Sequence, residues 1–270
     1  MADPPTVWDT PGHVPASEGG SGTVKTMSPG SSAGTAVEVS FRRGEDLCER
    51  TVEWKSAAME DLREAAPWRT FRWYRGQKHY SGWYWSSTTR DLVIYESRLE
   101  LANLMLADFD DRVRGIVAQP FLLATEVDGV LRRHVPDFLL DTDSGPVVVD
   151  VKPARRLDND DVARVLNLTR DVVEAKGWRY EVATEPPPRR AANVRFLAGY
   201  RRESAIVPDH CEAVQAVAQV GLTIGALIDR MPDRPDASVR AAVLHLIWRR
   251  RLHVDIDAAI TSRTQISRVL

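Results

Sequence analysis

Two short motifs in the middle of the 270-residue chain place charged side chains at the ends of apolar segments. Pro136-Asp137 opens one apolar segment, and Asp150-Val151-Lys152 ends the next. Side chains alternate between the two faces of a strand, so Asp150 and Lys152 point to the same face. Two carboxylates and one ammonium are therefore expected to converge where two adjacent strands meet. This combination can hold a divalent cation beside a scissile phosphate.

The ligand types in these motifs suit a hard cation such as Mg²⁺, with Mn²⁺ as a substitute. Mg²⁺ takes oxygen ligands and keeps several waters, so a few protein oxygens suffice. Asp137, Asp150 and the backbone carbonyl of Val151 are the candidate metal ligands. A further acid is expected from the preceding helix, where Glu96 and Glu100 lie four residues apart and so share one side. The residues alone leave the choice between these two acids open.

Other polar residues near the motifs have two interpretations each. Lys152 is expected to hold the attacking water or to neutralise charge that develops on the phosphate. His134, three residues before the Pro-Asp aspartate, is expected on the opposite strand face, as a packing or phosphate-contact residue. Gln119 either orients a catalytic group or makes a simple loop hydrogen bond. Arg155 and Arg156 either contact the DNA backbone near the scissile phosphate or are ordinary surface arginines.

The stretch from residue 70 to residue 95 is rich in aromatic and basic residues, and it includes Arg75 and Lys78. Glycines interrupt it as turns would, so short strands or a hairpin are expected. One interpretation is a nucleic-acid surface, with rings that stack on bases and with Arg75 and Lys78 on phosphates. The other is an edge sheet that packs its aromatic side chains on the core.

Composition sets limits on compartment and partners. The formal net charge is −2, so a uniformly basic nucleic-acid binder is excluded, although a local basic groove is not. Cys48 and Cys211 are the only cysteines, which predicts two reduced thiols and no disulfide framework. No apolar run approaches the length of a membrane span. A cytoplasmic protein, associated with the nucleoid when active and with no membrane partner, is expected.

Four parts are expected along the chain. Residues 1–36 are rich in Pro, Gly and Ser and should be disordered, and residues 37–95 should form an extension with short strands. Residues 96–204 should form an α/β core whose elements follow the order helix, three strands, helix, strand. Its expected helices and strands are 96–109, 121–127, 130–140, 146–152, 159–176 and 178–183, with a short apolar segment at 113–116 and an Asp128-Gly129 hairpin. A helix is also expected over 189–203.

The C-terminal part, residues 205–270, is expected to be a small α+β domain. Helix patterns cover about 209–220, 223–230 and 236–250, and short strand-like pieces follow at 252–256 and 264–266. Three short helices followed by a small hairpin predict a winged-helix-like domain. Such a domain can bind DNA, protein or both.

The motifs resemble those of a known superfamily. Pro136-Asp137 with Asp150-Val151-Lys152 resembles the PD-(D/E)xK nucleases, whose core is a restriction-endonuclease-like mixed sheet flanked by helices. More narrowly, the segments 99–102, 112–116, 119–121, 136–139 and 150–153 resemble the TnsA family, the endonuclease subunit of heteromeric transposases. The resemblance implies that Glu100 rather than Glu96 is the helix acid. The position of Asp150 can be Gln in that family, so its carboxylate is a departure.

The resemblance also implies an activity and partners. The implied activity is Mg²⁺-dependent cleavage of DNA at the 5′ ends of a mobile element. A DDE-type transposase subunit would cut the 3′ ends, and an AAA+ ATPase regulator would be contacted through the C-terminal domain. Two alternatives remain: a stand-alone PD-(D/E)xK nuclease of restriction or repair type, and a non-catalytic DNA-binding adapter.

Overall fold

The computed structural model describes residues 37–43, 47–69, 80–127 and 130–270. The tail 1–36, which the sequence predicts to be disordered, lies outside the described residues. So do Arg75 and Lys78, the two basic residues of the aromatic stretch. In the described part, helices and strands are mixed along the chain, as the expected α/β class requires.

The central sheet contains four strands in the order β11-β10-β9-β6. β10 and β11 run parallel, whereas β9 is antiparallel to both of its neighbours. A parallel pair needs a long crossover, and helix α3 (Asp160–Ala175) supplies it between β10 and β11. The bounds of the strands are β6 Val113–Ala118, β9 Phe138–Thr142, β10 Val147–Val151 and β11 Arg179–Ala183.

The two faces of the central sheet pack against different helices because β10 alternates its side chains. Val147, Val149 and Val151 share a core with helix α2 (Arg98–Phe109). Val148 belongs to a second core with Leu166 and other side chains of α3. The strand has no exposed residue, which explains why it reads as a continuous apolar run broken only by Asp150.

A second sheet lies beside the first and has the order β2-β1-β7-β8, with β3 paired to β1. The bounds of these elements are β1 Glu38–Arg43, β2 Cys48–Glu53, β3 Ala65–Ala66, β7 Leu122–Val127 and β8 Val130–His134, with the short helix α1 Met59–Arg63 after β2. The register of β7 and β8 pairs Val127 with Val130, as the expected hairpin requires. Residues 128 and 129 themselves lie outside the described residues.

The expectation of one strand over residues 130–140 is wrong. The chain leaves the second sheet after His134 and enters the central sheet at Phe138. Pro136 lies at this crossing and has no N–H to donate to a ladder. The β7–β8 hairpin consequently pairs with β1 instead of extending the central sheet.

Two further strands lie between β3 and α2 along the chain. Strands β4 (Gly82–Trp85) and β5 (Leu92–Tyr95) form a two-stranded antiparallel sheet. Tyr84 is buried, whereas Trp83 is 53% exposed, so the aromatic side chains of this hairpin face both the core and the surface.

The last part of the chain is mainly helical. Helices α4 (Pro188–Leu197), α5 (Pro208–Val217), α6 (Ile224–Asp229) and α7 (Asp236–Trp248) follow β11. α4 ends six residues before the expected limit of 203, and short 3-10 turns replace its last part. The strands β12 (Leu252–His253) and β13 (Arg268–Val269) form a minimal ladder. The expected strand at 264–266 is wrong, because Gln265 makes only an isolated bridge with Thr223. The winged-helix assignment stays a prediction.

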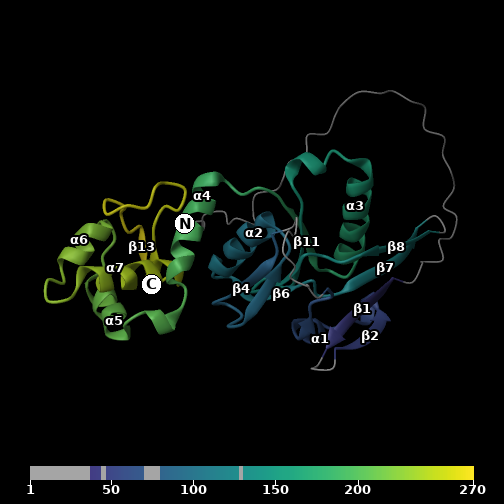
Figure 1. The fold of residues 1–270 in the computed structure, drawn as a ribbon, viewed down its shortest axis with the longest axis horizontal. Helices are drawn as coiled ribbons and strands as arrows, with labels where there is room; N and C mark the ends of the chain where they lie inside the picture. The colour runs from purple at the N-terminus through teal and green to yellow at the C-terminus, as the bar shows by residue number, and fades with distance from the viewer. Residues whose placement is uncertain (1–36, 44–46, 70–79, 128–129) are drawn as a thin grey trace.

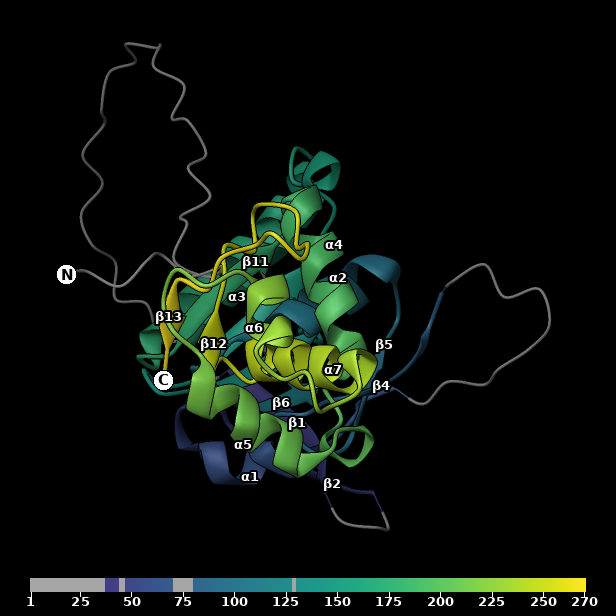
Figure 2. The ribbon, with the colours of Figure 1, turned by 90° about the vertical axis from the view of Figure 1, so that its left-hand side faces the viewer.

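Helices α5, α6 and α7 lie at one end of the molecule, and α1, α3 and the second sheet lie towards the other (Figure 1). Figure 2, turned by 90°, shows α5 and α7 in front of the strands. None of the helices in the described ranges is both long and apolar enough to cross a lipid bilayer.

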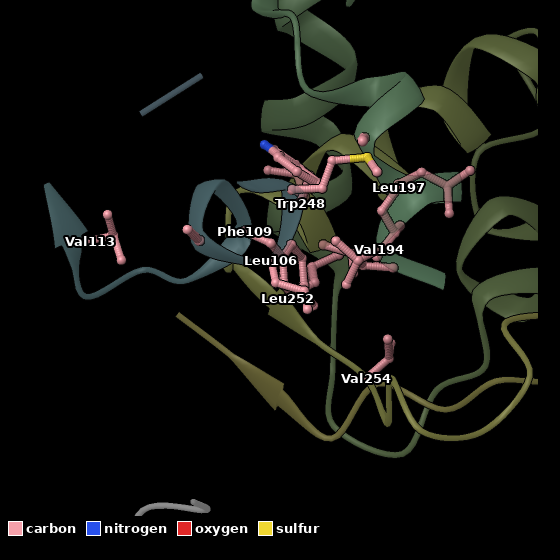
Figure 3. Close-up of a cluster of buried hydrophobic side chains, with 14 of the residues drawn as sticks. Leu106, Phe109, Val113, Val194, Leu197, Trp248, Leu252 and Val254 are labelled. Carbon is pink, nitrogen blue, oxygen red and sulfur yellow. The ribbon is translucent and has the colours of Figure 1, made fainter. Parts of the chain in front are cut away.

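One hydrophobic core joins the C-terminal helices to the central sheet. Trp248 of α7 packs on Phe109 of α2 with ring centroids 5.3 Å apart. Figure 3 shows these two side chains with Leu106 of α2 and Leu252 of β12 in one cluster. The core therefore continues across residue 205, the predicted boundary between two domains.

A buried carboxylate fixes the same region by hydrogen bonds. Asp108 of α2 is 5% exposed and accepts hydrogen bonds from the Tyr84 hydroxyl (2.8 Å), the Ser86 hydroxyl (2.7 Å) and the Thr88 N–H (2.8 Å). Buried polar groups need such partners, so Asp108 fixes the turn after β4 on the helix. Trp248 Nε1 also donates to this turn, at 2.8 Å from the Ser87 hydroxyl.

Candidate active site

Asp137 lies at the point where the chain enters the central sheet, one residue before β9. Its backbone carbonyl accepts a hydrogen bond from the Gln119 N–H at 2.9 Å. Its carboxylate Oδ2 accepts from the Val151 N–H at 2.6 Å and from Lys152 Nζ at 3.0 Å. Burial raises the pKa of the Asp137 carboxyl above its ordinary value, and the nearby Lys152 ammonium offsets this effect only in part. The Asp137 carboxylate is therefore partly desolvated and lies at the end of β10.

Lys152 follows β10 directly, and its ammonium group connects the two aspartates. Nζ lies 3.0 Å from Asp137 Oδ2, 3.4 Å from Asp150 Oδ1 and 3.2 Å from the Val151 carbonyl oxygen. Burial lowers the pKa of the lysine, but the charges of the two aspartates outweigh it, so the pKa is raised. Lys152 is thus a protonated cation held in a fixed position. The three side chains that the two motifs predict to converge do lie together.

Asp150 is the most buried of these groups, with 0% exposure. Its Oδ2 accepts from the Tyr180 hydroxyl at 2.6 Å and from His134 Nε2 at 2.7 Å. Burial alone would raise its pKa. Its hydrogen bond to His134 and the charges and hydroxyl around it reverse that effect and hold the pKa below the ordinary value. Asp150 is therefore an ionised acceptor, and the His134 nitrogen must donate to it.

The expected position of His134 is wrong. The expectation of an opposite face assumed one continuous strand from residue 130 to residue 140. The chain turns between β8 and β9, so strand alternation is not preserved between His134 and Asp137. His134, at the end of β8, lies instead against Asp150.

Tyr180 was not among the residues singled out from the sequence. It pairs in register with Val148 on the neighbouring parallel strand, so it faces the same side as Asp150. Aligning the apolar segment 178–183 beside 146–152 would have placed it there. Periodicity within one segment does not contain that information.

Glu100 is a helix acid close enough to Asp137 for the charge of that aspartate to act on it. It sits in the first turn of α2, where the Ser97 hydroxyl caps the helix by accepting from the Glu100 N–H at 3.1 Å. The Glu100 carboxylate accepts from the Glu96 N–H at 2.7 Å and from the Ser97 hydroxyl at 2.9 Å. Burial, followed by the charge of Asp137, raises the pKa of Glu100 to about 7.

Glu96 makes different contacts. Its carboxylate accepts from Gln119 Nε2 at 2.8 Å and from the Arg69 guanidinium at 3.3 Å. Gln119 is 4% exposed and has a backbone φ of 48°. This value lies in the left-handed region, which residues other than Gly rarely adopt. It donates to the Asp137 carbonyl and to Glu96, and its own Oε1 accepts from the Arg69 N–H at 2.9 Å. Gln119 therefore positions the backbone of Asp137 and the side chain of Glu96. Glu100, in contrast, is the acid whose pKa the charge of Asp137 raises.

The remaining predicted DNA contacts lie at the surface or outside the described residues. Arg155 and Arg156 are exposed and form a short 3-10 turn, Ala154–Arg156, just beyond Lys152. The turn is fixed by a hydrogen bond from the Ala154 N–H to Glu185 at 3.0 Å. This position close to Lys152 is compatible with both interpretations of the arginines.

The oxygen ligands of this site meet the needs of a hard cation only in part. Burial first, and then the charge of a nearby carboxylate, raise the pKa of both Glu100 and Asp137. A bound cation would favour the ionised form of both groups. Over the described ranges, both hydrogen bonds of the Asp137 carboxylate fall on Oδ2, which leaves Oδ1 for a ligand. The same ranges contain no group of three or more His, Cys, Asp or Glu side chains placed to hold a metal ion. Glu100, Asp137 and the Val151 carbonyl therefore fit Mg²⁺ only if water or phosphate supplies its other ligands.

The mixed sheet with an aspartate and a lysine at the ends of adjacent strands fits an α/β nuclease-like fold. Residues 110–185 match the family model for the TnsA-like endonuclease N-terminal domain. The chain therefore contains a TnsA-like nuclease domain, related to transposase subunits, and the resemblance seen in the motifs is confirmed. The match spans β6 to β11 and includes Asp137 and Lys152, whereas α2 with Glu100 precedes it. A search of curated proteins found no significant match.

Proposed function

We propose that the chain is the Mg²⁺-dependent endonuclease subunit of a heteromeric transposase and cleaves the 5′ ends of a mobile element by phosphodiester hydrolysis. The observation that supports this most directly is the Asp137–Lys152 contact of 3.0 Å within the TnsA-like domain. A surface ion pair would be common, but both of these groups are largely buried. Burial of charge is costly, and a catalytic task explains why it is retained here.

Each residue has a proposed role in hydrolysis. Asp137, Glu100 and the Val151 carbonyl hold Mg²⁺, which when bound supplies positive charge to the phosphate and activates the attacking water. Lys152 places its ammonium beside Asp137 and stabilises the negative charge that builds on the phosphate oxygens. Its fixed, protonated state suits this role because no reorganisation is needed when that charge appears. Arg155 and Arg156 contact the DNA backbone beside the cut.

The proposed partners follow from the family of the matched domain. A TnsA-like domain implies a DNA substrate and a transposase partner. We propose a DDE-type subunit that cuts the 3′ ends, together with an AAA+ ATPase regulator that contacts the C-terminal helices. Dependence on partners would also distinguish this chain from a stand-alone nuclease and from a non-catalytic adapter.

The test is a nicking assay on DNA that carries the element ends, with Mg²⁺, with and without the transposase and ATPase subunits. Wild type should nick only with the divalent ion, whereas Asp137→Asn and Lys152→Ala should lose about 100-fold or more of this activity. Asp141→Asn is the matched control, because it changes an aspartate on β9 that binds Arg63 at 2.8 Å instead of Lys152.

The outcomes separate the alternatives. Full cutting by wild type alone would favour the stand-alone nuclease. The proposed site would be refuted if Asp137→Asn and Lys152→Ala, both folded by circular dichroism, nicked the DNA as fast as Asp141→Asn. A wild-type chain that never nicks, even with its partners and Mg²⁺, would leave the adapter as the better description.

A further inference from the structure

The carboxylate of Asp150 is surrounded by donors from the protein itself. Oδ2 accepts from Tyr180 and from His134, at 2.6 and 2.7 Å. Oδ1 accepts from His134 at 2.9 Å and lies 3.4 Å from Lys152 Nζ. A carboxylate offers about four acceptor positions. Three side chains therefore contact its two oxygens, with the single Nε2–H of His134 shared between them, and its 0% exposure leaves no side open to solvent.

Asp137 differs from Asp150 in both respects. Its side chain is 17% exposed, and over the described ranges its two hydrogen bonds use one oxygen only. Its charge also raises the pKa of Glu100, so these two carboxylates are neighbours. The oxygens that an ion could reach are thus at Asp137 and Glu100.

The donors to Asp150 come from separate parts of the fold. His134 ends β8 in the second sheet, and Tyr180 lies on β11 at the edge of the central sheet. Asp150 itself lies two positions before Lys152, on the same face of the chain. A carboxylate anchored from two sheets is a rigid support for a neighbouring ammonium group, because neither oxygen can turn without breaking a buried hydrogen bond.

We propose that Asp150 is a positioning residue and not a metal ligand, and that His134 and Tyr180 hold it so that it directs the Lys152 ammonium toward the phosphate beside Asp137. This replaces the expectation from sequence that Asp150 is a ligand. It rests on the proposed function, because Lys152 needs a direction only if the site cuts DNA. His134 and Tyr180 thereby gain roles in catalysis without contact to the substrate.

The experiment compares metal binding with turnover in the full-length chain. Mn²⁺ binding is measured by titration calorimetry for wild type, Asp137→Asn, Asp150→Asn, Tyr180→Phe and His134→Gln, and nicking rates are measured with the partner subunits. Asp150→Asn should bind Mn²⁺ within about threefold of wild type yet lose about tenfold or more in kcat. Asp137→Asn should weaken Mn²⁺ binding by about 100-fold.

Tyr180→Phe and His134→Gln test the same inference if Asp150→Asn does not fold. Tyr180→Phe removes one hydroxyl and should lower kcat with unchanged Mn²⁺ affinity and unchanged KM for DNA. His134→Gln keeps an N–H donor and should retain more activity than His134→Ala. A kcat that equals wild type in Tyr180→Phe and in both His134 variants would overturn the proposal.

The failures of the two proposals can be told apart. The positioning role is overturned, and the endonuclease proposal kept, if wild type nicks DNA but Asp150→Asn loses Mn²⁺ binding as severely as Asp137→Asn. The endonuclease proposal itself fails, and the positioning role with it, if wild type neither nicks DNA nor binds Mn²⁺.

Discussion

The ionisation of Glu100 should make the stability of the metal-free protein depend on pH. Burial and the charge of Asp137 raise its pKa from 4.5 to about 7. An acid with a raised pKa in the folded state stabilises the fold while it is protonated. This contribution is complete below the ordinary pKa and is lost as the pH rises through the folded-state pKa. The loss should therefore fall between about pH 4.5 and pH 7.

The size of the effect follows from the same shift. A difference of one pKa unit corresponds to about 1.4 kcal/mol, so a rise from 4.5 to about 7 corresponds to about 3 kcal/mol of unfolding free energy. Glu100→Gln keeps the shape of the side chain and an oxygen that can accept from the Glu96 N–H, but it cannot ionise. The variant should therefore lack this part of the pH dependence.

The assay is urea unfolding of wild type and of Glu100→Gln, in the presence of a metal chelator, at several pH values from 4 to 8. The stability of wild type minus that of Glu100→Gln should fall by about 3 kcal/mol across this range. Glu96→Gln is the matched control, since it removes a carboxylate one helical turn earlier that Arg69 and Gln119 bind instead. A wild-type-minus-variant difference that stays constant with pH would refute the reasoning. Adding Mg²⁺ should flatten the slope if Glu100 helps to hold a cation.

Three further predictions concern other parts of the molecule. Glu100→Gln should reduce nicking more than Glu96→Gln, and equal residual rates would leave the helix acid unassigned. Asp108→Ala should lower the unfolding free energy by about 3 kcal/mol, because it leaves the Tyr84 and Ser86 hydroxyls without their buried acceptor; urea unfolding measures the loss. Replacing both Arg155 and Arg156 by Ala should weaken DNA binding and reduce the salt slope of log K by about two, and a slope equal to wild type would show that neither contacts a phosphate.

Local sequence patterns were sufficient for the elements that carry the site. The apolar periodicity of residues 96–109 predicted α2, and the apolar run before Lys152 predicted a buried strand. These patterns report one helix or strand at a time. They therefore predicted correctly that Asp137 and Lys152 would meet, because adjacent strands place them together.

Features that depend on distant segments could not be predicted in this way. The hairpin 122–134 looks like the next strands of the central sheet, and only its pairing with β1 shows that it belongs to another sheet. The contact of His134 with Asp150 depends on that change of sheet. The partnership of Asp150 with Tyr180 depends on the register of two strands that a long helix separates. The sequence marked the Gln119 amide as a candidate to orient a catalytic group. Its left-handed backbone and its hydrogen bond to Glu96 depend on neighbours from other segments.

The packing of Trp248 on Phe109 has a consequence for how this chain can be divided. A clone that stopped before α7 would leave Phe109 of α2 without its aromatic partner and would remove the donor to the Ser87 hydroxyl. Heating should therefore melt the nuclease sheet and the terminal helices in one cooperative step. Exchange of these helices between related enzymes would require the facing side chains of α2 to be transplanted with them.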